Sequence, residues 1–151
     1  MIQETHGDLI AMANAGQFDV IVHGCNCFCT MGAGIAKQIK TVFPAAFEAD
    51  CRTSKGDRIK LGTCSYATVN SVTVVNAYTQ YDWRGAGQKA DYEAIRSCLR
   101  TVAKGFPTSR IGLPQIGAGL AGGDWLTILG IIQEELGALN ATVVYYRQTA
   151  V

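Results

Sequence analysis

The sequence lacks several features that would place it in common protein classes. It has no run of like charges and a net charge of +1, so it does not show the basic surface that duplex nucleic acid requires. No apolar stretch is long enough to span a membrane, and the first ten residues, MIQETHGDLI, carry no signal-peptide pattern. We therefore expect a cytoplasmic protein that binds neither duplex nucleic acid nor a membrane.

The cysteines also lack the arrangement of a structural zinc site. Cys25, Cys27 and Cys29 alternate, and on a regular strand their side chains would share one face. A structural zinc ion needs four ligands, and no second cysteine pair follows downstream. His23 would lie beside Cys25 on a strand, which is unfavourable for a nucleophile and its base. We expect reduced thiols that pack as small apolar side chains, with no metal and no cofactor.

Strand-like and helix-like segments alternate along the chain, without a repeat or a linker. This pattern predicts an α/β fold with a mixed sheet. The expected strands are 1–5, 18–24, 62–69, 71–78, 109–114 and 141–147, with a hairpin turn around Asn70 and Ser71. The expected helices lie within 7–16, 34–44, 45–54, 90–105 and 123–137. Asp91 is expected at the start of the fourth helix, and Gly123 or Asp124 at the start of the fifth.

Glycine is unusually frequent, and eight of its 17 copies fall in three short segments, Gly32–Gly34, Gly85–Gly87 and Gly117–Gly123. The stretch VIVHGCNCFCTMGAGIA runs from a buried strand into a glycine loop and then a helix, and IGLPQIGAGLAGGDW repeats this order. Glycine lets the backbone approach an anion, and a helix N-terminus offers free N–H groups. If the two strands are parallel neighbours, both loops line one cleft suited to a diphosphate. Gly119 is expected to need either positive φ or close backbone approach.

Four segments together resemble the macro domain, the ADP-ribose-binding fold: GDLI, VIVHGCN, MGAGIA and LPQIGAGLAGGDW. The resemblance covers nearly the whole chain and is strongest to the yeast-type ADP-ribose-1″-phosphate phosphatases. It implies a single macro domain over residues 1–151, with three layers and a mixed sheet of about six strands flanked by helices. The implied ligand is ADP-ribose or ADP-ribose-1″-phosphate, with ADP-ribosylated macromolecules as further possible partners.

The resemblance also implies roles for individual residues. Asp8, followed by Leu9, would bind the adenine amino group, and Asn26 would hold the distal ribose. An aromatic residue near the C-terminus, Tyr145 or Tyr146, would flank the adenine, and Tyr145 is the residue we predict. Two loops would cover the diphosphate: Gly32, Ala33, Gly34 and Ile35 in the first, and Ile116, Gly117, Ala118, Gly119 and Leu120 in the second.

The resemblance to the macro domain also bears on the catalytic residues. A neighbouring branch of deglycosylases uses a lysine–aspartate pair, which aligns here with Gln80 and Ala121. Neither residue can form a covalent lysine adduct or supply that carboxylate. For a phosphatase, His23 is the predicted general base or nucleophile, because its ordinary pKa suits neutral pH. The alternative for His23 is a structural residue that is satisfied by a hydrogen bond. Three functions stay open: a phosphatase on ADP-ribose-1″-phosphate, a non-catalytic reader of ADP-ribose, and a hydrolase that removes ADP-ribosyl or acetyl groups.

Overall fold

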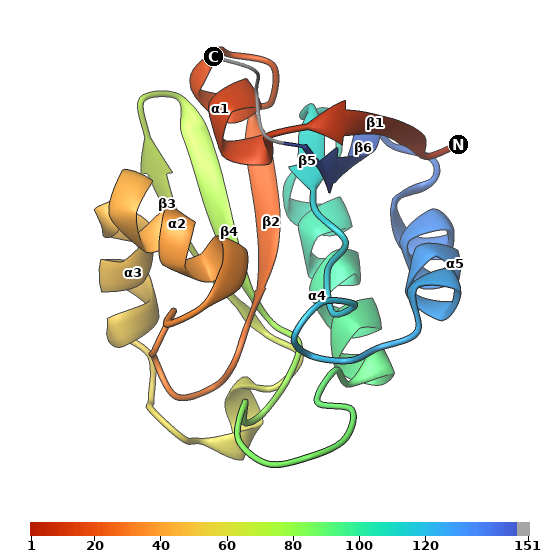
Figure 1. The fold of residues 1–151 in the computed structure, drawn as a ribbon. Coiled ribbons are helices and arrows are strands. Elements are labelled where there is room, and N and C mark those ends of the chain that lie inside the picture. Colours follow the sequence, from red (N-terminus) through yellow and green to blue (C-terminus); the bar gives the residue numbers. More distant parts are fainter. Residues whose placement is uncertain (148–151) are drawn as a thin grey trace.

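A six-stranded mixed sheet forms the centre of the computed structural model, which describes residues 1–147 (Figure 1). Residues 148–151 of the predicted domain lie outside the described residues. The strand order is β1-β6-β5-β2-β4-β3, and only the edge strand β3 runs antiparallel to its neighbour. The strands are β1 (Gln3–Gly7), β2 (Val20–Cys25), β3 (Cys64–Val69), β4 (Val72–Tyr78), β5 (Ile111–Leu113) and β6 (Ala141–Tyr146).

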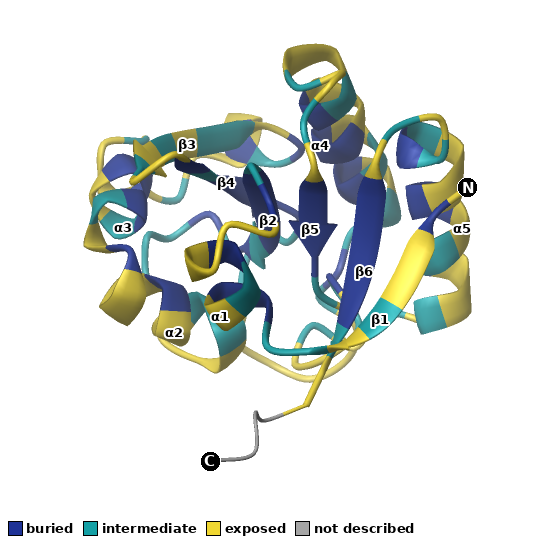
Figure 2. Ribbon diagram, turned by 90° about the horizontal axis from the view of Figure 1, so that it is seen from above, coloured by how far each residue is buried: buried dark blue, intermediate teal, exposed yellow. Residues whose placement is uncertain are grey.

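Helices cover both faces of this sheet. The helices are α1 (Leu9–Asn14), α2 (Gly34–Val42), α3 (Pro44–Cys51), α4 (Tyr92–Gly105) and α5 (Trp125–Leu136), with a short 3-10 helix η1 (Arg58–Lys60). The first three helices lie on one face, and α4 and α5 lie on the other (Figures 1 and 2). The predicted α/β fold with three layers is confirmed. Among residues 1–147, no helix is both long and apolar enough to cross a membrane.

The central strand β2 shows how the sheet divides the core. All but one of its six residues are buried, as expected for a strand covered on both faces. Val20 and Val22 belong to the apolar cluster under α4 and α5, whereas Ile21 belongs to the cluster under α1 and α2. Figure 2 shows this buried strand between the two helical layers.

Local signals in the sequence set the ends of several elements. Asn70 and Ser71 have φ of 50° and 69°, and positive φ at both central residues is typical of the tight hairpin that joins β3 to β4. The Asp91 carboxylate accepts a hydrogen bond from Ala94 N at 3.0 Å and caps α4. Asp124 caps α5 in the same way through Thr127 N. The predicted hairpin and both helix starts are confirmed.

The three alternating cysteines do not lie together on one strand. Strand β2 ends at Cys25, and Cys29 lies in the following loop with φ of 58°. A period of two therefore does not apply, and the shared face that a regular strand would give does not form. Cys25 and Cys27 are buried against Met31 and Tyr78, and all six thiols are free. Burial raises the pKa of Cys25 and Cys27, which keeps both thiols protonated.

Candidate functional site

The pairing of β2 with β5 fixes the position of the site. The two strands are parallel, with Val20 opposite Ile111 and Ile21 opposite Gly112. Their carboxyl ends therefore open on the same edge of the sheet, where ligands bind in open α/β folds. The condition for a shared cleft, that these two strands are parallel neighbours, is met, and both glycine loops follow from this edge.

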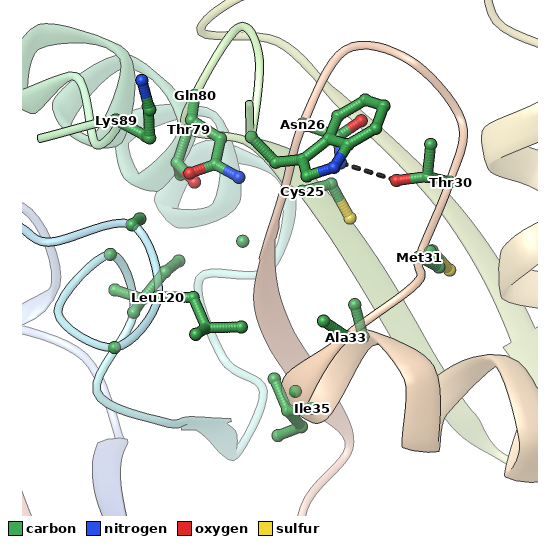
Figure 3. Close-up of a pocket in the computed structure, with 18 of the residues that line it drawn as sticks. Cys25, Asn26, Thr30, Met31, Ala33, Ile35, Thr79, Gln80, Lys89 and Leu120 are labelled. Carbon is green, nitrogen blue, oxygen red and sulfur yellow. Dashed lines mark hydrogen bonds between the residues drawn. The ribbon is translucent and has the colours of Figure 1, made fainter. Parts of the chain in front are cut away.

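Two adjoining cavities lie between the loops. The main cavity has a volume of about 660 Å³ and the side cavity about 380 Å³. Both are lined by Gly34, Ile35, Pro114, Gln115 and Gly119, so they form one continuous cleft. Leu120 lies on the side of the cleft opposite Ala33 and Ile35 (Figure 3). Because the two cavities share these residues, different parts of one ligand can occupy both.

The first loop leads into the N-terminus of α2. Gly32, Ala33, Gly34 and Ile35 all line the main cavity. Ala33 caps the helix without a side-chain hydrogen bond, so the first N–H groups of α2 are left for a ligand. Gly34 has φ of +59°, a backbone conformation that glycine adopts without strain. These N–H groups and the positive end of the helix dipole favour an anion.

The second loop packs against core residues of α4 and α5 at Gly117. A Cβ at Gly117 would lie 3.0 Å from Ile95 and 3.2 Å from Ile128, and its φ is +75°. The Gly117 carbonyl also accepts a hydrogen bond from Gly123 N at 2.8 Å. Ile116 is buried beneath this loop and lines the main cavity, whereas Ala118 lines the side cavity. Leu120, 83% exposed, reaches towards the first loop, since its Cδ1 would be 3.9 Å from a Cβ at Gly34.

Gly119 corrects one expectation about this loop. Its φ is not in the positive region, which Gly117 and Gly122 occupy instead. A Cβ at Gly119 would meet no protein atom within 4 Å, and the same holds for Gly32 in the first loop. Both residues line the main cavity. The protein's own packing therefore does not require glycine at these positions, and the space beside both backbones is open to the cavity.

Asn26 lines the main cavity, and two hydrogen bonds hold its side-chain amide in place. Its Oδ1 accepts a hydrogen bond from Phe28 N at 2.8 Å, and its Nδ2 donates to Thr30 Oγ1 at 2.7 Å (Figure 3). These bonds orient the amide while leaving one lone pair and one N–H for a ligand. Asn26 is thus a preorganised hydrogen-bonding group in the cavity wall.

Asp8 and Leu9 lie in the side cavity. Asp8 caps α1, because its Oδ1 accepts a hydrogen bond from Ala11 N at 3.1 Å. The other oxygen, Oδ2, makes no hydrogen bond within the described chain. Asp8 can therefore act as a helix cap and accept a hydrogen bond from a ligand at the same time.

The structure does not bring Tyr145 to the cleft. The Tyr145 hydroxyl donates to Glu4 and accepts from Trp125 Nε1 at 3.1 Å, and the ring packs on the apolar cluster under α5. Tyr146, 65% exposed, lines the side cavity with Asp8. Successive side chains on a strand point to opposite faces of the sheet. The aromatic residue that lines the cleft is therefore Tyr146, one position after the predicted Tyr145.

His23 is likewise outside the cleft. Its side chain is 0% exposed, lines neither cavity, and makes a 2.7 Å hydrogen bond through Nε2 to Asn76 Oδ1. Burial lowers the pKa of His23 to about 4, and the bond to Asn76 offsets this only in part. A neutral imidazole without access to the cleft cannot take a proton from water or attack phosphorus there. The structure thus gives His23 the structural role that was the alternative to catalysis.

Several residues of the main cavity carried no clear signal in the sequence. Asp50, on α3, and Gln80, after β4, hold the two buried side-chain oxygen atoms without a hydrogen-bond partner in residues 1–147, Oδ2 and Oε1 respectively. Trp83 and Lys89 also line the cavity. Gln80 and Ala121 stood out in the sequence only because they align with the lysine and the aspartate of the deglycosylases. Both residues line the main cavity. No group of three His, Cys, Asp or Glu side chains in the described part of the chain could hold a metal ion.

Comparison with known proteins identifies the family. The model of the macro domain matches residues 22–132, and the chain belongs to this family. The chain is 34% identical to an uncharacterized 17.5 kDa protein of Enterobacteria phage T4, over 95% of this chain and 96% of that protein. A solved structure of a Bacteroides thetaiotaomicron protein superposes with a TM-score of 0.83 at 28% identity, over 97% of this chain and 100% of that one.

Two more relatives carry names that describe an activity. One is a DNA ADP-ribosyl glycohydrolase of Mycobacterium tuberculosis, 26% identical over 83% of this chain and 36% of that protein. The other is an ADP-ribose 1″-phosphate phosphatase of Aspergillus clavatus, 39% identical over 47% of this chain and 33% of that protein. The chain spans about a third of the length of each of these two relatives.

Proposed function

We propose that the protein binds ADP-ribose in the cleft between the two glycine loops. The observation that carries this proposal is the convergence of both loops on one cleft at the ends of β2 and β5. In the proposed pose the diphosphate lies between the N-terminus of α2 and the loop Ile116–Leu120, where backbone N–H groups supply the hydrogen bonds. This mode of binding needs no lysine or arginine, because the helix end and the N–H groups provide the positive potential.

The two ends of the ligand follow from the walls of the two cavities. The side cavity would take the adenine, with Asp8 accepting from the exocyclic amine and Tyr146 against the ring. Asn26 in the main cavity would hold the distal ribose through the donor and acceptor that its own loop leaves unused. The two cavity volumes, about 380 and 660 Å³, support a ligand with one group in each.

Calorimetry with ADP-ribose and AMP tests this proposal. AMP has the adenine but lacks the second phosphate and the distal ribose, so it should bind at least about tenfold more weakly, a difference of about 1.4 kcal/mol. ADP-ribose should also raise the melting temperature more than AMP at the same concentration, because it stabilises only the folded state. Equal affinities for both ligands would show that the main cavity does not bind the distal half.

We propose hydrolysis at the distal ribose as a second candidate function. Besides Asn26, the main cavity is lined by two polar side chains, Asp50 and Gln80, that the proposed pose of ADP-ribose does not use. ADP-ribose-1″-phosphate is the substrate that the sequence predicted, and the Aspergillus clavatus phosphatase supports it. The same cavity is also compatible with an ADP-ribosylated macromolecule, and the mycobacterial glycohydrolase supports that alternative.

Release of inorganic phosphate from ADP-ribose-1″-phosphate separates these possibilities. A phosphatase releases phosphate and ADP-ribose in equal amounts over many turnovers. A protein that binds ADP-ribose without releasing phosphate would be a reader, or would act on another substituent of the distal ribose.

A further inference from the structure

Asp50 is a buried carboxylate in the wall of the main cavity. It lies on the last turn of α3 and is 1% exposed. Its Oδ1 accepts a hydrogen bond from the Tyr78 hydroxyl at 2.7 Å, whereas Oδ2 has no partner within residues 1–147. A buried carboxylate oxygen without a donor is costly in a folded protein. A hydrogen-bond donor on a ligand in this cavity would remove that cost.

The surroundings of Asp50 leave it able to exchange a proton. The titratable groups packed around it are Lys60 on η1, Tyr78 on β4, and the thiols of Cys25, Cys27, Cys29 and Cys51. Lys60 is occupied elsewhere, because its Nζ donates to the Cys27 carbonyl at 3.1 Å and makes no ion pair with Asp50. Burial raises the pKa of Asp50, while the hydrogen bond from Tyr78 and the charge of Lys60 lower it in part.

Asp50 also lies in the part of the cavity where the distal ribose is expected. Cys25, Asn26, Thr30 and Met31 line the same cavity, and the loop they form is joined to Asp50 by the hydrogen bond from Cys29 Sγ to the Asp50 carbonyl, 3.2 Å. Two other ionisable side chains line this cavity, Cys25 and Lys89. Burial raises the pKa of the Cys25 thiol well above its ordinary value, and the Lys89 Nζ donates to the Ala86 carbonyl. Figure 3 shows the Lys89 amine directed away from Asn26.

We propose that Asp50 is the acid–base residue of a hydrolase that cleaves a bond between C1″ of ADP-ribose and a nitrogen or oxygen atom of an acceptor. This inference rests on the proposed binding of ADP-ribose and on the second candidate function. The bond from C1″ to the acceptor breaks, and its electron pair stays on the acceptor atom, which takes the proton of Asp50. The oxygen of a water molecule bonds to C1″, and the proton that this water loses returns to Asp50. Gln80 Oε1 offers a second acceptor for N–H or O–H groups of the departing group.

A merely structural Asp50 would anchor α3 to β4 through Tyr78, and conservative variants separate the two roles. Asp50→Asn keeps an acceptor for the Tyr78 hydroxyl but has no exchangeable acid. Tyr78→Phe removes the anchoring bond but keeps the carboxyl. Glu48→Gln makes the same chemical change at an exposed position of α3 and serves as the matched control.

The experiment measures ADP-ribose release from two probes whose acceptor is attached at C1″: ADP-ribose-1″-phosphate and an oligonucleotide that carries an ADP-ribosyl group. The first is hydrolysed in ¹⁸O-labelled water, where cleavage of the C1″–O bond releases unlabelled phosphate and cleavage of the P–O bond releases labelled phosphate. On the probe that the wild type cleaves, Asp50→Asn should lower kcat about 100- to 10,000-fold, with the affinity for ADP-ribose within about twofold. Wild-type kcat should fall as pH rises through the Asp50 pKa, and Asp50→Asn should lack this fall. Tyr78→Phe should move the fall to higher pH, because it removes an interaction that lowers the pKa. Glu48→Gln should match the wild type.

Two results would overturn the inference in distinguishable ways. If Asp50→Asn cleaves a probe as fast as the wild type, Asp50 is structural, while the hydrolase proposal stands. If the wild type binds ADP-ribose but cleaves neither of the probes, the hydrolase proposal fails and the role of Asp50 fails with it. Circular dichroism of each variant, together with its ADP-ribose affinity, identifies a loss of activity that comes from misfolding.

Discussion

His23 should make the protein sensitive to acid, because the folded state holds it as a neutral imidazole. The side chain is fully buried, and burial lowers its pKa from 6.5 to about 4. Above pH 6.5 the imidazole is neutral in the folded and the unfolded chain, and its contribution to stability is fully present. As pH falls towards 4, the unfolded chain binds a proton that the folded protein excludes, and this contribution is lost.

The size of the effect follows from the two pKa values. One pKa unit corresponds to about 1.36 kcal/mol, so the gap between 6.5 and about 4 is worth about 3 kcal/mol. About 2 kcal/mol of this is lost between pH 7 and pH 5. The free energy of unfolding of a domain is roughly 5–15 kcal/mol, so this loss is a large fraction of the total stability.

Urea unfolding at pH 7 and pH 5 measures this loss. His23→Gln cannot be protonated, but its Nε2 can donate to Asn76 Oδ1 in place of the imidazole. The wild type should lose about 2 kcal/mol more than His23→Gln between the two pH values. An NMR titration of the wild-type imidazole gives the same information without a variant. A His23 pKa near 6.5 would refute the reasoning, because it would show that burial does not disfavour the protonated imidazole in the folded protein.

Two predictions concern the walls of the cleft. Gly119→Val should weaken ADP-ribose binding by at least about tenfold and leave the circular dichroism spectrum unchanged, because the new side chain enters the cavity without meeting protein atoms. The matched control is Gly130→Val on the exposed side of α5, where a Cβ also meets no atom, and this variant should retain full affinity. Full affinity in Gly119→Val would contradict this account. Tyr146→Ala should weaken binding by about 0.5–1.5 kcal/mol through loss of contact with the adenine. Tyr145→Phe should bind ADP-ribose as the wild type does. Weaker binding by Tyr145→Phe, with wild-type binding by Tyr146→Ala, would show that Tyr145 belongs to the site.

The elements that the sequence predicted well depend on local chemistry. Asn70 and Ser71 form a tight turn because both adopt positive φ, and Asp91 and Asp124 start helices by accepting backbone hydrogen bonds. The glycine loops were also predicted from local sequence, since in each one the glycines stand between a buried strand and a helix. Such features involve residues a few positions apart, so a short stretch of sequence contains the information that determines them.

The errors concern side chains whose surroundings come from distant parts of the chain. His23 is enclosed because it lies opposite Asn76 on β4, a register that no local pattern specifies. Tyr145 and Tyr146 differ by one residue, and a shift of one residue on a strand exchanges the two faces of the sheet. Asp50 gave no signal at all, because the stretch FEADC is compatible with an ordinary surface helix. Only the packing of α3 on β4 and the Cys25–Met31 loop places its carboxylate in the cavity wall.

Amide NMR spectra recorded during addition of ADP-ribose test the central claim, that both glycine loops bind one ligand. The signals of Gly34 and Ile35, at the N-terminus of α2, and of Gly117–Gly119 should shift together, with one dissociation constant. The signal of Gly130, on α5 away from the cleft, should not move. Shifts in one loop alone, or separate dissociation constants for the two loops, would contradict the shared diphosphate site.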